Sequence, residues 1–302
     1  SRKSGRPVKM MMDRDEVFRA SGPASAARLT VKVGGKKDGT ITAMQTSIAY
    51  EAGAFKGSPA MIGGMTAFTP YNCPNVYCET FDVVVNKPKV AAYRAPGAPQ
   101  AEFGAEMAVS ELAEKLGIDP VDLRLQNAAK EGTQTVYGPK LKAVGLVECL
   151  EAAKNSPHYK TELKEGEGRG IASGFWFNIG GQSSVTINMN PDGTGTIVEG
   201  SPDIGGSRAS MQMMASEELG IPLNDLKPII GDTESIPYNQ STGGSRTTFA
   251  TGMAVIEAAQ DVVQQLKERA ASLWNVTPDQ VEWRDGSAIN TAGEGQMTCA
   301  EI

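Results

Sequence analysis

The sequence contains few of the residues that most metal sites and nucleic-acid surfaces use. Histidine occurs once, as His158, and there are four cysteines among 302 residues. These counts argue against a zinc site, an iron–sulfur cluster or a Ser-His-Asp triad built from this chain's own side chains. Lys and Arg total 29 against 35 Asp and Glu, a net charge of −6. Because nucleic-acid binders need a basic surface, no nucleic-acid partner is expected.

Long hydrophobic runs are also missing. No stretch approaches the ~20 apolar residues that span a bilayer, and the basic start is followed by charged residues rather than by a signal-peptide core. We therefore expect no membrane association and a cytoplasmic location. Reduced thiols are the main interpretation of the cysteines. A disulfide between Cys73 and Cys78, or half of a metal site there, is the alternative.

Glycine, in contrast, is abundant, with 34 residues. The first 50 residues have the pattern of strands, including a hairpin over 28–48, and residues 80–85 predict another strand. A long helix is expected to begin near Pro99 and to end at Gly117. Asp119 and Pro120 then predict the start of a second helix. A third helix is expected over residues 146–154.

Strand patterns resume after a charged connector at residues 159–168. Strands are expected over 170–177 and 184–189, followed by a hairpin turn at 190–193, a helix over 208–219 and a strand over 226–230. A long helix over 247–273 and a hairpin over 282–289 complete the chain. Because strands and helices do not alternate regularly, the fold class is α+β, with mixed sheets and packed helices. The expected domains are residues 1–160 and 161–302.

Three glycine-bearing turns each precede an expected helix. We name them turn 1 (Ala92–Gln100), turn 2 (Gly200–Arg208) and turn 3 (Asn239–Thr248). Such a turn exposes unpaired backbone N–H groups at the positive end of a helix dipole, where a phosphate can bind. Hydroxyl groups and one arginine in each turn, Arg94, Arg208 and Arg246, add donors. None of the turns matches a P-loop or a Rossmann fingerprint.

Several separated motifs resemble the large subunit of molybdenum hydroxylases, the xanthine dehydrogenase and aldehyde oxidoreductase family. They are, in order, residues 6–16, turn 1, Gly117–Asn127, Asp203–Ser207 and Ser241–Ser245. The resemblance extends over nearly the whole chain. It implies an oxidoreductase that hydroxylates an aldehyde or an electron-poor heteroaromatic carbon with water as the oxygen source.

The resemblance also implies the cofactor and its neighbours. The cofactor would be molybdopterin, in the cytosine dinucleotide form usual in bacterial members, and it would carry the molybdenum without protein ligands. Iron–sulfur clusters and FAD would lie on partner domains or subunits. Tyr93 and Arg94 would lie near the molybdenum. The cofactor would be bound by Arg94, Gly205, Gly206, Ser207, Thr242, Gly243, Gly244 and Ser245. These turns are expected to converge around one concave surface.

The sequence departs from the family pattern at several points. Gly206 stands where many members have Gln, and Tyr93-Arg-Ala-Pro-Gly replaces Phe-Arg-Gly-Phe-Gly. The family's general-base Glu, in a Gly-Glu-Pro-Pro context, is absent, so no catalytic residue is expected in this chain. We therefore expect an internal fragment, inactive alone, whose partners are the remaining large-subunit segments, an iron–sulfur subunit and a flavin subunit. A cofactor-free scaffold and a binder of another phosphorylated ligand are the alternatives.

Overall fold

The computed structural model describes residues 1–177, 180–231, 233–236 and 238–302. The chain folds as two compact units, Ser1–Trp176 (unit 1) and Phe177–Ile302 (unit 2). Both units combine small sheets with packed helices, which confirms the predicted α+β class.

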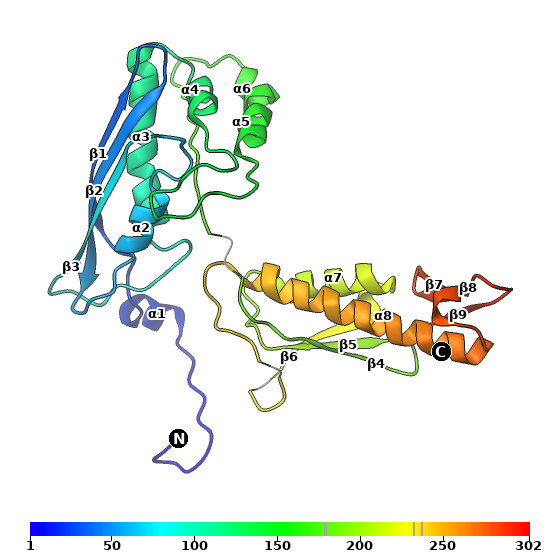
Figure 1. Cartoon of the computed structure of the whole chain (residues 1–302). Helices are drawn as coiled ribbons and strands as arrows, with labels where there is room; N and C mark the ends of the chain where they lie inside the picture. Colours follow the sequence, from blue (N-terminus) through cyan, green and yellow to red (C-terminus); the bar gives the residue numbers. More distant parts are fainter. Residues whose placement is uncertain (178–179, 232, 237) are drawn as a thin grey trace. The chain divides into compact units, whose positions relative to one another are not determined.

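Unit 1 is built on a three-stranded sheet with the strand order β1-β2-β3. β1 and β2 are antiparallel, whereas β3 runs parallel to β2 after a crossover through α2. α2 and α3 cover one face of this sheet (Figure 1). The elements are α1 (Arg14–Ala20), β1 (Ala27–Gly35), β2 (Ile41–Gly53), α2 (Ala60–Thr66), β3 (Val76–Val84), α3 (Ala98–Leu116), α4 (Pro120–Asn127), α5 (Leu146–Asn155) and α6 (Pro157–Lys160).

The core of unit 1 lies between α3 and the sheet. α3 buries a face of small residues, Ala101, Ala105 and Ala113 together with Val109, against apolar side chains of β2. Alanine lets the helix approach the sheet closely, and it is also the best helix former. Leu112 and Leu116 of the same helix are half-buried.

The predicted helix boundaries of unit 1 are confirmed. α3 ends at Gly117, which takes the left-handed conformation (φ 67°) usual for a helix C-cap. The Asp119 side chain accepts hydrogen bonds from the backbone N–H groups of Val121 and Asp122, and Pro120 occupies the first position of α4. Short polar side chains and Pro therefore specify this connection locally.

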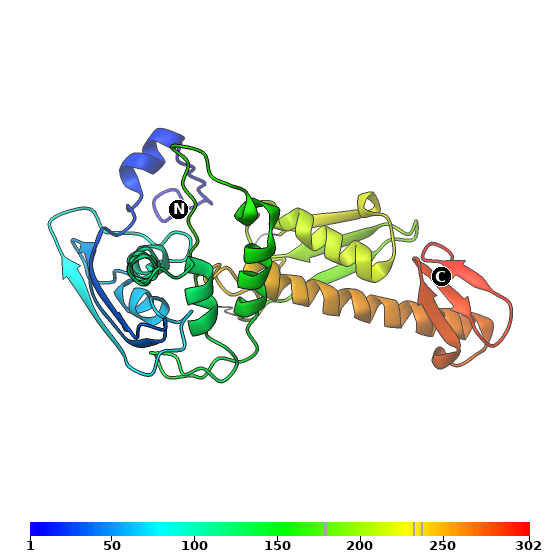
Figure 2. The same cartoon turned by 90° about the horizontal axis from the view of Figure 1, so that it is seen from above.

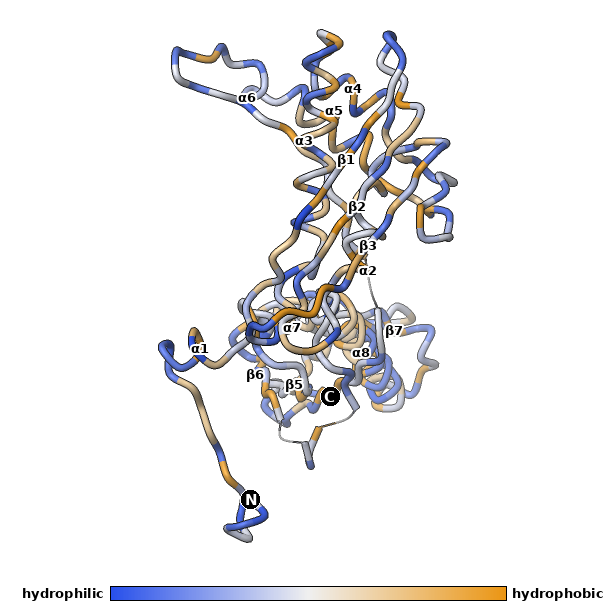
Figure 3. The backbone as a smooth tube through the Cα atoms, turned by 90° about the vertical axis from the view of Figure 1, so that its left-hand side faces the viewer, coloured by the Kyte–Doolittle hydropathy of each residue, from blue (hydrophilic) through white to orange (hydrophobic). Residues whose placement is uncertain are grey.

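Two expected strand regions of unit 1 are wrong. Residues 14–20 form α1, because Asp13 and Glu16 make a reciprocal capping box that starts a helix. The segment before α1, coloured as partly hydrophobic in Figure 3, is not packed: the Met10 and Met11 side chains are 92% and 85% exposed.

Residues 170–177, at the junction of units 1 and 2, were expected to form a strand, but they have no regular secondary structure. Two carboxylates of α3 replace the missing strand partner: Glu106 accepts from the N–H of Ser173 and Glu102 from the N–H of Phe175, both at 2.8 Å. We name this stretch the clipped segment. The alternating sequence pattern was real, but side chains satisfy the backbone instead of a neighbouring strand.

Unit 2 repeats the order of elements found in unit 1. Its main sheet has the order β4-β5-β6, with β5 and β6 parallel and connected through α7. α7 and α8 lie side by side on this sheet (Figures 1 and 2). The elements are β4 (Thr186–Met189), β5 (Gly195–Glu199), α7 (Ser207–Leu219), η1 (Leu223–Asp225), β6 (Leu226–Ile230), η2 (Thr247–Thr251), α8 (Gly252–Trp274), η3 (Pro278–Gln280), β7 (Val281–Arg284), β8 (Ser287–Asn290) and β9 (Gln296–Thr298).

Most sequence-based boundaries in unit 2 are confirmed. The Asn190–Gly193 turn closes through the N–H of Gly193 and the carbonyl of Asn190 (2.9 Å) and joins β4 to β5. Gly220 caps α7 in the left-handed conformation. The long last helix differs at its start, because Thr247–Thr251 forms one π-helical stretch before α8. A π-helical start of this kind is frequent at functional sites.

The structure also shows the state of the cysteines and of the single histidine. All four cysteines are free, and burial raises the pKa of the Cys73 and Cys78 thiols. His158 is exposed on α6. Within the described part of the chain, no helix is long and apolar enough to cross a membrane, and no cluster of three or more His, Cys, Asp or Glu side chains could hold a metal ion.

Candidate functional site

Turn 1 connects β3 to α3 in unit 1 and is held rigidly from behind. Gly97 has φ 87°, its carbonyl accepts the Tyr50 hydroxyl (2.6 Å), and a Cβ there would lie 2.5 Å from the Pro59 carbonyl oxygen. Only glycine fits this close approach. Beyond it the turn is open: Arg94 is exposed and Tyr93 is 53% exposed. Turn 1 therefore presents a phenol and a cation on a fixed backbone.

Turn 2 connects β5 to α7 in unit 2. Gly205 and Gly206 both have positive φ (68° and 85°), and nothing lies within 4 Å of where their Cβ atoms would be. Ser207 is buried, with its hydroxyl within 3.5 Å of Asp203 Oδ1. The same Asp203 oxygen accepts from the N–H of Arg208 at 3.1 Å. The open surface of turn 2 is thus its glycine backbone, since Asp203 already serves the first turn of α7.

Turn 3 precedes η2, and most of its backbone is exposed. Gly243 has open space around it, while Gly244 and Ser245 have positive φ (65° and 60°). Arg246 follows in the right-handed conformation (φ −80°, ψ −21°). A left-handed residue followed by a right-handed one directs successive N–H groups toward one concavity, which is typical of anion-binding nests.

Turns 2 and 3 lie at the same end of unit 2. They follow β5 and β6, which are parallel, so both leave the carboxyl edge of the sheet, where ligands of open α/β sheets commonly bind. A hydrogen bond between the hydroxyls of Ser201 and Thr251 (2.9 Å) joins the start of turn 2 to η2. This part of the expected convergence is present within unit 2, whereas turn 1 belongs to unit 1.

Sequence patterns alone did not single out the buried polar network under these turns. Thr251 also bonds the hydroxyl of Ser183 (3.0 Å), which in turn accepts from the guanidinium of Arg246. Glu199 is buried next to Ser201, whose N–H donates to it, and burial raises the pKa of this carboxyl. The missed signal was Gly180–Gly181, a further glycine pair that precedes no helix.

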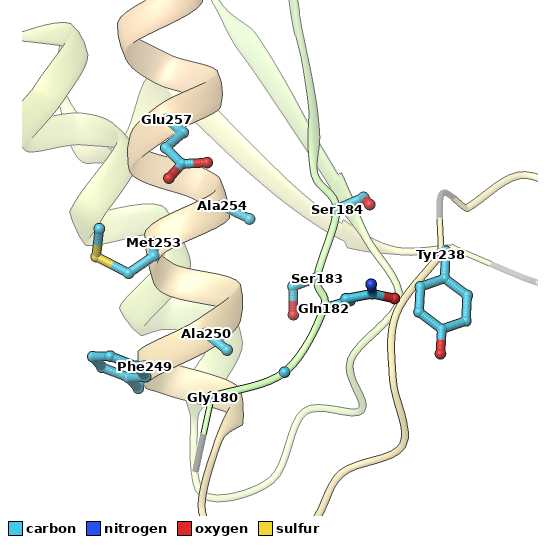
Figure 4. A pocket seen from close by; sticks show the side chains of 11 residues that line it. Gly180, Gln182, Ser183, Ser184, Tyr238, Phe249, Ala250, Met253, Ala254 and Glu257 are labelled. Atoms are coloured by element: carbon cyan, nitrogen blue, oxygen red, sulfur yellow. The ribbon is translucent and has the colours of Figure 1, made fainter. Parts of the chain in front are cut away.

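A pocket of about 470 Å³ opens beside this network in unit 2. Figure 4 shows residues 180–184 facing the first turns of α8, with Tyr238 on a neighbouring loop. The wall of the pocket is partly polar and partly apolar. The lining residues are Gly180, Gly181, Gln182, Ser183, Ser184, Tyr238, Phe249, Ala250, Met253, Ala254 and Glu257. Hydroxyls and backbone groups at one side and Phe249 and Met253 at the other suit a polar heterocycle.

The acids of α3 near turn 1 have structural partners. Glu106 is buried in an ion pair with Arg124 (2.7 Å) and also accepts the Tyr71 hydroxyl. Burial, followed by the charge of Glu106, raises the pKa of Tyr71. Burial also raises the pKa of Glu102 to about 7, although the N–H of Phe175 opposes this shift. Both acids thus stabilise unit 1 by holding the clipped segment.

Comparison with known proteins decides the family. The family model described as molybdopterin cofactor-binding domain matches residues 1–128 and 143–302 in two parts. The chain belongs to this family. Turns 1, 2 and 3 therefore lie within molybdopterin cofactor-binding domains, and the sequence-based family resemblance is confirmed.

Individual relatives agree with the family model. The chain is 29% identical to the xanthine dehydrogenase molybdenum-binding subunit of Escherichia coli O157:H7, over 90% of the chain and 39% of that protein. It is 28% identical to the aldehyde oxidoreductase molybdenum-binding subunit PaoC of the same organism, over 98% of the chain and 42% of that protein. The chain thus spans about two fifths of the length of these relatives.

Solved structures share the fold. Quinoline 2-oxidoreductase from Pseudomonas putida 86 matches 99% of this chain and 42% of its own, with a TM-score of 0.83 and 21% identity. The aldehyde oxidoreductase from Desulfovibrio desulfuricans ATCC 27774 matches with a TM-score of 0.69 and 27% identity, over 85% of this chain and 30% of its own. Each match covers only part of the longer solved chain.

Proposed function

We propose that this chain is the cofactor-binding part of a molybdenum-dependent hydroxylase that oxidises an aldehyde or an electron-poor heteroaromatic carbon, with water as the oxygen source. The observation that carries the proposal is the pairing of turns 2 and 3 at the carboxyl edge of one parallel strand pair. Such an edge with glycine turns suits a phosphorylated cofactor. The family membership identifies molybdopterin as the cofactor class.

The residues present fit the phosphate and pterin of that cofactor. Gly205, Gly206 and Gly243 offer backbone N–H groups in open space, where no side chain blocks a ligand. Two buried polar atoms without a partner, Thr247 Oγ1 and Arg246 Nε, belong to the last residues of turn 3. When bound, the cofactor supplies the two-electron chemistry that the side chains of this chain lack.

The chain's own residues would bind the cofactor and orient it. In unit 2, Gly205, Gly206 and Ser207, together with Thr242–Ser245, would hold the phosphate and pterin. In unit 1, the exposed Tyr93 and Arg94 would lie near the metal and supply a cation and a hydroxyl donor on the rigid backbone at Gly97. Substrate oxidation would further require segments and redox partners beyond this chain, namely iron–sulfur and flavin carriers, and a cytosine dinucleotide would extend the cofactor.

A charge placed in turn 3 tests the proposal. Gly243→Asp introduces a carboxylate where the phosphate would bind, and because Gly243 has open space and no positive φ, the variant should fold. The matched control is Gly168→Asp, in the connector of unit 1, which also has open space and no positive φ. We expect Gly243→Asp, produced in the gene product that contains this chain, to lose most of its molybdenum and pterin. Metal analysis and pterin fluorescence measure both. Equal contents in the two variants would contradict the proposal.

A cofactor-free scaffold is the second candidate, favoured by one observation. Gly206 occupies a position where many family members carry Gln, so one side-chain contact to the cofactor is missing. This candidate expects no molybdenum and no pterin in the unmodified protein under cofactor-replete conditions. Our proposal expects both in stoichiometric amounts.

A further inference from the structure

Arg246 is one of the largest fully buried side chains of the protein. It is 2% exposed and lies near the end of turn 3. Its guanidinium donates to the carbonyl oxygens of Gln240 (2.9 Å) and Gln182 (2.8 Å) and to the hydroxyl of Ser183. One side chain thus fixes the start of turn 3 to the segment that forms the pocket wall.

Among the residues that the structure describes, no carboxylate balances the charge of this guanidinium. No ion pair joins a described carboxylate to Arg246. Its Nε–H is buried without an acceptor and packs against Gly181, where a Cβ would lie 2.8 Å from Nε. Gly181 lines the pocket. A buried cation without an anion is expensive, so such a group indicates that an anion binds nearby.

We propose that Arg246 is a positioning residue that shapes turn 3 for an anionic phosphate and supplies the positive potential that attracts it. This inference rests on the proposed function. The hydrogen bonds of Arg246 hold the backbone between Gln240 and η2, so the N–H groups that follow Gly244 keep the concave arrangement. The positive charge of Arg246 acts on the phosphate through the backbone of turn 3, and the guanidinium does not contact the phosphate directly.

Two substitutions separate shape from charge. Arg246→Met keeps much of the volume and removes the charge, whereas Arg246→Lys keeps the charge and loses the fork of donors. The control Arg284→Met removes an exposed cation of unit 2 that pairs with Glu282. The probe is inorganic pyrophosphate, titrated calorimetrically at two salt concentrations, and the melting temperature of each variant is measured in parallel.

We expect Arg246→Met to bind pyrophosphate at least about tenfold more weakly than the unmodified chain, because both the positive potential and the hydrogen bonds that shape turn 3 are lost. Arg246→Lys should recover most of this loss while melting at a lower temperature, and Arg284→Met should bind normally. A merely structural arginine would give equal losses in the Lys and Met variants, in step with their melting temperatures, and would overturn the inference. So would normal binding by a folded Arg246→Met.

A measurement on the unmodified chain remains decisive if Arg246→Met does not fold. The buried Nε–H of Arg246 should exchange slowly and give its own ¹⁵N–¹H signal, assigned by its loss in Arg246→Lys. We expect this signal and the amides of Gly243 and Gly244 to shift together, with one dissociation constant, on adding pyrophosphate. Shifts of the turn amides without the Nε–H overturn the inference but leave the proposed function standing. Absence of any pyrophosphate binding contradicts both.

Discussion

Units 1 and 2 share one order of elements, a hairpin, a helical crossover to a parallel third strand, and a long helix across the sheet. In this scheme turn 1 and turn 3 are equivalent, because each leads from the third strand into the long helix. The units differ in what stands behind these turns. Turn 1 is closed by tight backbone packing at Gly97, whereas turn 3 is backed by hydroxyls and Arg246.

Each unit also buries one arginine completely, Arg124 in unit 1 and Arg246 in unit 2, among the residues that the structure describes. Arg124 is neutralised by Glu106, whereas the hydrogen bonds of Arg246 to described residues all go to neutral acceptors. The same topology can therefore bury an arginine for two purposes. An arginine that pairs with a carboxylate stabilises the fold, whereas we infer that an arginine without such a partner favours the binding of an anion. Four predictions test this contrast.

The largest effect is expected from breaking the balanced charge of unit 1. Arg124→Met leaves Glu106 buried without its partner, which should lower the free energy of unfolding by about 3–5 kcal/mol. Lys154→Met is the matched control, since Lys154 pairs with Asp122 at the surface and should change stability by less than about 1 kcal/mol. Urea denaturation measures both variants. A loss below 1 kcal/mol for Arg124→Met would show that the Arg124–Glu106 pair is not important for the stability of unit 1.

The next effect concerns two glycines with nearly the same φ, Gly97 (87°) and Gly206 (85°). Alanine at either position pays the left-handed strain of about 1–2 kcal/mol. At Gly97 the added Cβ also meets the Pro59 carbonyl oxygen, which raises the expected loss to about 2–5 kcal/mol. Denaturant midpoints of the two variants measure the difference. Equal losses would mean that turn 1 is no more closed than turn 2.

A pH effect is expected from Glu102, which holds the clipped segment. Its folded-state pKa of about 7 lies above the ordinary value of 4.5, because burial and then Glu106 disfavour its charge, while Phe175 N–H opposes them. The folded state therefore keeps a proton that the unfolded state loses, so stability should fall as the pH rises from about 4.5 to 7. Glu102→Gln keeps an acceptor for Phe175 and should flatten this fall. Melting temperatures across that range measure it, and parallel curves for both proteins would refute the assignment.

The smallest effect is expected at the entry of α7. Asp203→Asn keeps an acceptor for the N–H of Arg208 but removes a charge near the helix N-terminus and a partly exposed ion pair with Arg208. The expected loss is about 0.3–1 kcal/mol, and it should shrink in high salt. Thermal unfolding at two salt concentrations checks this. A larger, salt-independent loss would show that turn 2 depends on Asp203 for its shape.

Local signals predicted much of the fold. Gly117, Asp119 and Gly220 specify helix ends through their own backbone preferences, so these boundaries were predictable without tertiary structure. The clipped segment was not, because its partners are side chains of α3 some 70 residues away in the sequence. The same holds for α1, where a capping box outweighed the surrounding strand pattern.

The candidate site shows the same division. The glycine turns were found because glycine and hydroxyl residues cluster before helices. Arg246 has the same sequence context as the exposed Arg94, and nothing local indicates that its side chain turns inward to Gln182 and Ser183. Long-range hydrogen bonds of this kind decide whether an arginine faces a ligand or supports the backbone that does.

The clipped segment has a consequence for how unit 1 responds to solvent. Ser173 and Phe175 belong to no helix or strand, yet their N–H groups donate to carboxylates, one of which, Glu106, is buried. In hydrogen exchange these two amides should be protected like those of a β-strand. They should exchange when the hydrogen bonds to the two carboxylates break, without unfolding of the sheet. The exchange rates of the Ser173 and Phe175 amides would thus measure how often the side chains of Glu106 and Glu102 move away from the clipped segment.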